Sequence, residues 1–149
     1  MRINAFSDVC LRAMMLLAAA PEGELLTTQA ITDGVGVPYN HVSKAVMKLR
    51  SLDLVAVTRG RAGGAAISPA GRTATVGWLL RQLDGREDLV DCEFPHGDCP
   101  LNHDCGLRSA LRRAREAFYR ELDDVVISEL PNPKQMGPVF VNLLTRRPA

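Results

Sequence analysis

Three cysteines lie close together in the second half of this chain: Cys92, Cys99 and Cys105. Thiolate ligands favour zinc, copper(I) and iron–sulfur clusters over hard cations. Six residues separate the first two cysteines and five separate the last two, whereas structural zinc sites usually use pairs with about two to four intervening residues. His96 and His103 lie in the same segment and could complete a Cys₃His zinc site, and a thiol switch is another alternative. The spacing therefore predicts a site for a soft metal without deciding which metal it holds.

The fourth cysteine and the two nearby histidines have simpler interpretations. Cys10 falls on the apolar stripe of a predicted helix, so we interpret it as a small buried hydrophobic side chain. His96 and His103 near Cys99 resemble a thiol–histidine pair, but neighbours in a loop are a poor guide to geometry. The sequence offers no other nucleophile–base pairing, no phosphate-binding loop before a helix and no paired carboxylates in an evident cleft. We therefore expect that the protein is not an enzyme.

Composition is typical of a globular protein of one domain or a little more. The chain has 149 residues, of which 46% are apolar and 23% charged. Its longest strongly apolar run, residues 13–20, is too short to cross a bilayer, and the first residues lack the pattern of a signal peptide. We expect a cytoplasmic location, where reduced cysteines serve more often as metal ligands or redox thiols than in disulfides.

Charge is divided unevenly along the chain. Residues 1–81 carry nine Lys and Arg against five Asp and Glu, whereas residues 82–149 carry nine against twelve. Six basic residues and one acidic residue lie within 40–72, and seven acidic residues and one basic residue lie within 84–104. A basic cluster of this kind is typical of nucleic-acid binding, although a run of charge alone can be a solvated helix face.

The basic segment coincides with a predicted helix-turn-helix. A first helix over about residues 4–19 follows from apolar residues at helical spacing. Thr27 is the predicted N-cap of a short second helix, which Gly34-Val35-Gly36 ends. Pro38 suits the first turn of a third helix. The buried stripe of that third helix is predicted to be Val42, Ala45, Val46 and Leu49.

The opposite face of the third helix is polar. Such side chains bond base edges and phosphates in the major groove, and two helices joined by a glycine-containing turn are typical of DNA-binding proteins. Tyr39 and His41 could equally be structural residues at the helix entry. The predicted DNA contacts from these helices are Thr28, Tyr39, Asn40, His41, Ser43, Lys44 and Lys48.

A predicted β-hairpin follows the third helix. Two short apolar segments flank the glycine-rich turn Arg59-Gly60-Arg61-Ala62-Gly63-Gly64. Arg59 and Arg61 at its tip suit phosphate or a narrow minor groove. Placed directly after a helix-turn-helix, the hairpin is interpreted as a wing. Residues 1–72 therefore form a predicted winged helix-turn-helix, in a fold that is mainly α with a small β-hairpin.

The second half predicts dimerisation helices around the cysteine segment. A helical stripe over residues 76–83 ends at Asp84-Gly85. From about Leu107 a long helix carries a seam close to that of a coiled coil, formed by Leu107, Leu111, Ala114, Phe118, Leu122 and Val125. A helix of about 20 residues spans roughly 30 Å, which is long for so small a domain to cover. This predicts a homodimer through residues 73–130, with packing inside one chain as the alternative and residues 131–149 as a tail.

Several short motifs together are similar to one known family. The motifs are Met1-Arg2-Ile3, Phe6-Ser7-Asp8, Val37-Pro38-Tyr39, Val76-Gly77-Trp78-Leu79, Val90-Asp91-Cys92-Glu93, Glu116-Ala117-Phe118-Tyr119, the wing and the three-cysteine segment. They extend from Met1 to about Leu130. Each motif alone is modest, but in combination the chain resembles the NsrR-type nitric-oxide-sensing repressors of the iron–sulfur winged-helix regulator family, which also includes IscR.

The resemblance implies a dimer with one [4Fe–4S] cluster in each subunit. Cys92, Cys99 and Cys105 would bind three of the irons, and Asp8 of the other subunit would be the fourth ligand. Without the resemblance, Asp8 is simply an acidic residue in the early turns of a helix, where it favours the helix dipole.

The resemblance also implies a function and its alternatives. IscR-like members have a histidine three residues after the last cysteine and a [2Fe–2S] cluster, whereas this chain has Arg108 there, although His103 could substitute. The implied protein is a repressor that leaves its double-stranded DNA operator when nitric oxide disrupts the cluster. The alternatives are a regulator that senses iron–sulfur supply or redox state through a [2Fe–2S] cluster, and a zinc-stabilised interaction module that senses nothing.

Overall fold

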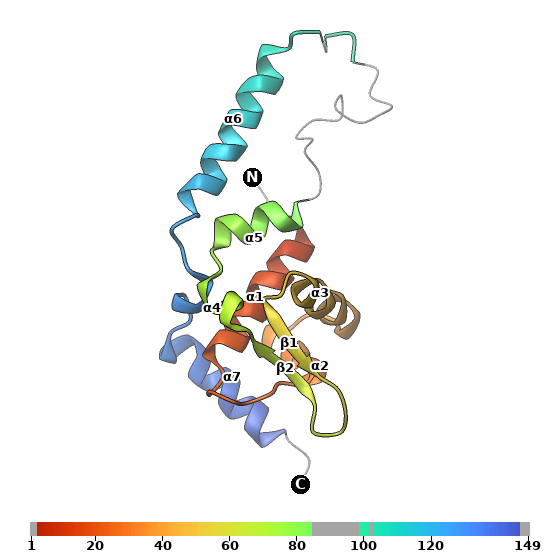
Figure 1. Cartoon of the computed structure of the whole chain (residues 1–149), viewed down its shortest axis with the longest axis vertical. Helices are drawn as coiled ribbons and strands as arrows, with labels where there is room; N and C mark the ends of the chain where they lie inside the picture. The colour runs from red at the N-terminus through yellow and green to blue at the C-terminus, as the bar shows by residue number, and fades with distance from the viewer. Residues whose placement is uncertain (1–2, 85–98, 102, 147–149) are drawn as a thin grey trace.

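The computed structural model (Figure 1) describes residues 3–84, 99–101 and 103–146. Its elements in chain order are α1 (Ala5–Ala19), α2 (Thr28–Val35), α3 (Tyr39–Ser51), β1 (Val55–Thr58), β2 (Gly64–Ile67), α4 (Pro69–Thr73), α5 (Val76–Leu83), α6 (Gly106–Glu121), the 3₁₀ turn η2 (Ile127–Glu129) and α7 (Pro133–Thr145). The described part of the chain is thus mainly helical with one two-stranded antiparallel sheet, which confirms the predicted fold class.

Side chains cap the first two helices, and the cap at Thr27 is the one predicted from the sequence. The Asn4 side chain accepts a hydrogen bond from the Phe6 N–H at 2.8 Å, and Thr27 Oγ1 accepts one from the Ala30 N–H at 3.1 Å. Each bond satisfies a backbone donor that the first turn of a helix leaves without an intrahelical partner. Gly36 follows α2 in the left-handed conformation, and Pro38 lies directly before α3 rather than inside its first turn.

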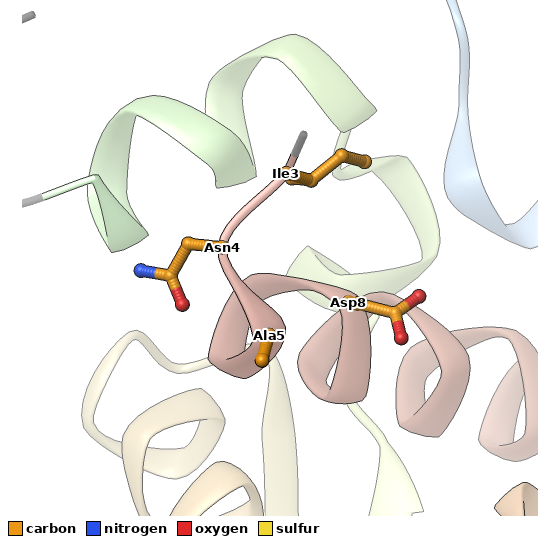
Figure 2. Close-up of a pocket in the computed structure, with 4 residues that line it drawn as sticks. All are labelled: Ile3, Asn4, Ala5 and Asp8. Carbon is orange, nitrogen blue, oxygen red and sulfur yellow. The ribbon is translucent and has the colours of Figure 1, made fainter. Parts of the chain in front are cut away.

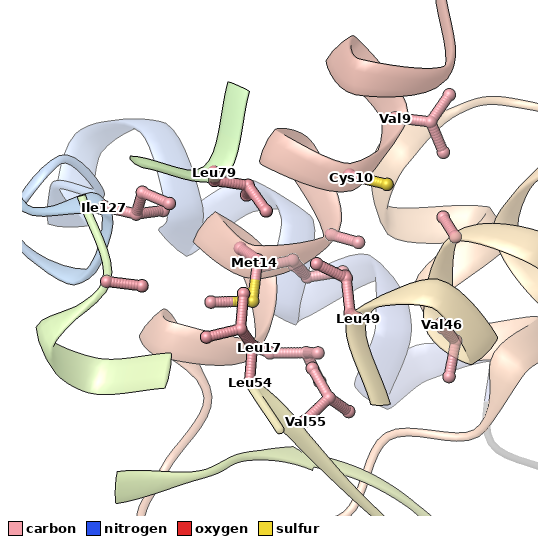
Figure 3. Close-up of a cluster of buried hydrophobic side chains, with 14 of the residues drawn as sticks. Val9, Cys10, Met14, Leu17, Val46, Leu49, Leu54, Val55, Leu79 and Ile127 are labelled. Atoms are coloured by element: carbon pink, nitrogen blue, oxygen red, sulfur yellow. The ribbon is translucent and has the colours of Figure 1, made fainter. Parts of the chain in front are cut away.

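The core is built around α1, which packs against α2, α3, α5, β2 and η2. Figure 3 shows Cys10, Met14 and Leu17 of α1 meeting Leu49 of α3 and Leu79 of α5. All four positions of the predicted α3 stripe are buried, as predicted. Cys10 is completely buried, and burial raises the pKa of its thiol to about 12. Cys10 is therefore a core side chain that stays protonated, as the sequence indicated.

The long helix α6 is shorter than predicted, because the residues after it bond to the start of α5. The helix ends at Glu121 and has 16 residues, so the last two positions of the predicted seam lie beyond it. The carbonyls of Leu122 and Val125 accept hydrogen bonds from the N–H groups of Gly77 and Val76, each at 2.9 Å. The chain thus turns back onto the start of α5, because these carbonyls bond outside the helix instead of continuing it.

Residues beyond Leu130 differ from the expected tail. They form α7, which packs against α2, and Met136, Val139 and Phe140 contact the core from it. Pro133 occupies the first turn of this helix, where no backbone hydrogen bond is lost. Pro138 lies inside the helix, where it lacks the N–H that would bond to the preceding turn.

An ion-pair cluster fastens α6 to α5. The Arg81 guanidinium bonds both carboxylate oxygens of Asp123, at 2.5 and 3.0 Å, and Glu116 at 2.9 Å. It also lies 5.3 Å from the centre of the Tyr119 ring, whose hydroxyl donates to Asp84. Hydrogen bonds from Arg81 lower the pKa of both Glu116 and Asp123. The end of α5 and the C-terminal turns of α6 are thereby held as one unit.

This cluster predicts a pH-dependent contribution to stability. The ordinary pKa values of Asp123 and Glu116 are 3.8 and 4.5, and both are lower in the folded chain. A carboxyl group with a lowered pKa stabilises the fold above its unfolded-state pKa and loses that effect as pH falls through the folded-state pKa. Arg81→Gln should therefore lower the melting temperature at pH 7, and the gap from wild type should begin to close as the pH falls below about 4. Circular dichroism melts from pH 7 to 3 measure this, with the exposed α6 variant Arg113→Gln as control. A gap that is constant across this range would contradict the assignment.

Candidate DNA-binding surface and metal centre

The outer face of α3 carries the predicted DNA contacts. Burial of the four stripe residues turns the remaining side chains away from the core. Asn40, His41 and Lys44 are exposed, and Tyr39 is 49% exposed. Ser43, Lys48 and the α2 residue Thr28 are partly buried. The structure thus places these residues on the helix-turn-helix with accessible side chains, while their contact with DNA stays a prediction.

Sequence reasoning omitted two exposed side chains on α3. Met47 is 58% exposed and Arg50 is exposed. Met47 is apolar, and apolar residues of an amphipathic helix are expected in the core. Its place in the helical repeat, opposite the buried stripe, is the signal that could have identified it.

The wing is a regular antiparallel hairpin. Strands β1 and β2 pair from Val55 with Ile67 to Thr58 with Gly64. Gly60 has φ +112°, and a side chain on Gly63 would collide with the Thr58 carbonyl, so this tight turn requires both glycines.

Arg59 and Arg61 occupy the tip of this hairpin and are exposed. The helix α3 packs against β1, so the polar face of α3 and the wing arginines belong to one structural unit. In Figure 1 α3 and the hairpin lie on the same side of α1. This unit carries the basic cluster found in the sequence, and its charge suits a phosphate backbone.

Two of the three clustered cysteines lie within the described residues, just before α6. Cys99 and Cys105 are both partly buried free thiols. Cys105 is the N-cap residue of α6 and makes no side-chain capping hydrogen bond. Asp104 precedes it with φ +50°, so the backbone turns sharply there. Cys92 and His96, and the glycine at position 85 that was predicted to end α5, lie outside the described residues. His103 is exposed.

Asp8 lies near the start of α1 and is paired within its own helix. Arg12 Nε donates to Asp8 Oδ1 at 3.1 Å, and Arg12 Nη2 lies 2.7 Å from Oδ2. The Asp8 side chain remains 42% exposed. It borders a surface cavity of about 690 Å³ together with Ile3, Asn4 and Ala5, and Figure 2 shows the carboxylate projecting from the helix.

The described part of one chain does not bring the proposed ligands together. Among these residues no group of three or more His, Cys, Asp and Glu side chains could hold a metal ion. In Figure 1 the N-terminal end of α6 projects away from α1, the helix that carries Asp8. Any site that uses both must therefore draw on more than one chain or on another arrangement of α6.

The projecting half of α6 exposes apolar side chains. Leu107 is 66% exposed and Leu101, just before the helix, is 77% exposed. Tyr119, near the other end, is the buried residue of this helix. Two large exposed apolar side chains, one at the start of α6 and one just before it, favour a further packing partner.

A search for membrane-spanning segments found none among the helices of the described residues.

Comparison with known proteins agrees on one family. The family model described as Rrf2, iron-dependent transcriptional regulator, matches residues 3–133. Over 149 residues the chain is 45% identical to the HTH-type transcriptional repressor NsrR of Streptomyces coelicolor, with 98% of each chain covered.

Solved structures agree on the fold. The chain superposes on CymR, the global cysteine regulator of B. subtilis, with a TM-score of 0.66 at 22% identity, covering 87% of this chain and 95% of that one. For T. potens IscR the TM-score is 0.66 at 18% identity, with 87% and 85% covered. Together with the sequence match, these findings show that the chain belongs to the Rrf2 family of iron-dependent transcriptional regulators and is a DNA-binding transcriptional repressor, not an enzyme.

Proposed function

We propose that this repressor responds to nitric oxide through a [4Fe–4S] cluster held by Cys92, Cys99 and Cys105 of one subunit and Asp8 of the other. The observation that carries the proposal is the separation of the donors: two partly buried thiols precede α6, while the half-exposed carboxylate lies on α1, away from them. A homodimer in which α6 of each subunit reaches the other supplies both kinds of ligand at one place. The exposed side chains of Leu107, on α6, and Leu101, just before it, support such a contact.

The donor set fits an iron–sulfur cluster. Thiolates are the usual ligands of such clusters, and the thiols of Cys99 and Cys105 are accessible rather than enclosed in the core. Cys105 occupies the N-cap position of α6, where the helix dipole favours an anionic ligand. When bound, the cluster supplies iron atoms with which nitric oxide reacts. Asp8 would offer an oxygen, a poorer match for cluster iron than a thiolate, so it would be the most easily released of the four protein ligands.

Arg12 gives Asp8 an alternative partner. Both carboxylate oxygens are engaged by the Arg12 guanidinium in the chain described here. An exposed pair of this kind, four residues apart in a helix, contributes only about 0.3–0.5 kcal/mol, so it competes weakly with a metal. Release of Asp8 from the cluster would return the carboxylate to Arg12.

Helix α1 connects Asp8 with the DNA-binding surface. The buried face of α1 packs on α3, and the buried residues Cys10 and Met14 lie two and six residues after Asp8 in the same helix. A change in how Asp8 ties α1 to the other subunit therefore changes the placement of both α3 helices. Moving the DNA-bound population from 99:1 to 1:99 requires a differential of about 5.5 kcal/mol, which we attribute to loss of the metal site between the subunits.

On DNA, the dimer would present its two α3 helices to adjacent major-groove segments of a near-palindromic operator, with the wings on the backbone. Residues 1–72 would contact DNA, with α7 supporting α2, and residues 73–130 would hold the cluster and the dimer. A location with the DNA, in the cytoplasm, follows from this role.

Asp8→Ala tests the proposed ligand. The variant should keep an iron-bearing cysteine site, while its visible spectrum and its rate of reaction with nitric oxide change, because one iron loses its protein ligand. The matched control is Arg12→Ala, which removes the ion pair and leaves the carboxylate. If Asp8→Ala matches wild type in spectrum and nitric-oxide response, or if Arg12→Ala shows the same change, Asp8 is not the ligand.

A further inference from the structure

Met47 is a large apolar side chain on the otherwise polar outer face of α3. It is 58% exposed, whereas Met14 is completely buried in the core. In the described chain the core therefore does not account for its presence. An exposed methionine on a helix that presents polar groups to DNA needs a different explanation.

Helix geometry places Met47 among the predicted DNA contacts. It follows Asn40 by seven residues, Ser43 by four and Lys44 by three, and all four positions lie within α3. Residues at these spacings share one face of an α-helix. The buried stripe from Val42 to Leu49 occupies the opposite side. When Asn40 and Lys44 face the major groove, Met47 faces it too.

The chemistry of its neighbours limits what Met47 can recognise. Amide, hydroxyl and ammonium groups hydrogen-bond base edges and phosphates, whereas the thioether is at most a weak acceptor. The C5 methyl group of thymine is the apolar feature of the major groove, and apolar side chains contact it. Methionine is unbranched and flexible, so it can reach and cover such a group.

We propose that Met47 is a sequence-specificity residue that contacts a thymine methyl group in each operator half-site. This inference rests on the proposed use of α3 as the recognition helix. The contact buries roughly one methyl group of thymine against the Met47 side chain. This burial corresponds to about 0.8 kcal/mol, or about fourfold in affinity. Met47 thereby favours thymine at one position through its methyl group, whereas Asn40 and Lys44 form hydrogen bonds.

The test pairs a protein variant with a single-methyl change in DNA. Double-stranded DNA is first selected from a random library by the cluster-loaded wild-type dimer. Each thymine of the selected site is then replaced in turn by deoxyuridine, which lacks only the C5 methyl. Affinities of wild type and Met47→Ala are measured by fluorescence anisotropy at one fixed salt concentration. Val141→Ala is the matched control, because Val141 is 59% exposed and lies on α7.

At one thymine in each half-site, removal of the methyl group should lower the DNA affinity of wild type and of Val141→Ala about fourfold. Met47→Ala should bind the thymine and deoxyuridine versions of that position equally. The proposal is overturned if Met47→Ala loses as much as wild type at every position, or if no deoxyuridine substitution weakens wild type. Failure of the wild-type dimer to select any DNA would instead contradict the α3 interface itself.

Discussion

Cys105→Ala should purify with almost no bound iron or sulfide, and its affinity for operator DNA should fall by about 10⁴-fold. The cluster requires its thiolates, and in the proposed mechanism the cluster holds the two subunits in the DNA-binding arrangement. Cys105 makes no side-chain capping bond to α6, so alanine removes the ligand without removing a helix cap. Iron and sulfide assays with gel-shift titration on selected DNA measure both effects.

Cys10→Ala provides the matched control for this loss. Cys10 is a thiol of the same chain that is completely buried between α1 and α3. Its removal should lower thermal stability through a small cavity and leave iron, sulfide and DNA affinity unchanged. Equal loss of iron in both variants, or tight operator binding by Cys105→Ala without iron, would contradict the assigned roles.

Removal of both wing arginines should cause the largest loss of DNA affinity that leaves the cluster intact. Arg59 and Arg61 are exposed on a turn that Gly60 and Gly63 make tight. If each contacts DNA phosphate in both subunits, the double alanine variant loses about four contacts, and the slope of log affinity against log salt should shrink by about 3.6. At 0.1 M salt this corresponds to about 4 × 10³-fold weaker binding.

A control must remove the same charge elsewhere. Lys134 in α7 and Arg146 directly after it are exposed, so the double variant Lys134→Ala, Arg146→Ala removes two charges per subunit away from the wing. Its salt slope should stay close to that of wild type. A wing variant that keeps the wild-type salt slope would show that the hairpin does not contact the backbone.

Local patterns were enough to predict the DNA-binding half. The stripe from Val42 to Leu49 is a helical repeat within thirteen residues, and the glycine-rich turn predicts the hairpin directly. Thr27 marks a helix start through a hydrogen bond to a residue only three positions away. These helices and this hairpin could be predicted from sequence because the residues that determine each one lie within it or directly beside it.

Features that depend on contacts between residues far apart in the sequence could not be predicted from it. Arg81 reaches Asp123 across 42 residues, and nothing near either residue marks them as partners. The end of α6 depends on carbonyls that bond to the start of α5, so the apolar seam alone overestimated its length. Helix α7 is stabilised by packing on α2, and its prolines obscured it. The proposed metal site has the same character, since its ligands converge only when two chains meet.

The most direct test of the nitric-oxide sensor is the metal content of anaerobically purified protein, with its visible spectrum recorded before and after addition of nitric oxide. The proposed site predicts about four iron and four sulfide per chain, little zinc, and a spectrum that nitric oxide reshapes. About two iron and two sulfide would indicate a [2Fe–2S] regulator instead. Zinc without sulfide, or a spectrum that nitric oxide does not change, would contradict the proposed nitric-oxide sensing. The assignment as a winged-helix repressor would still stand.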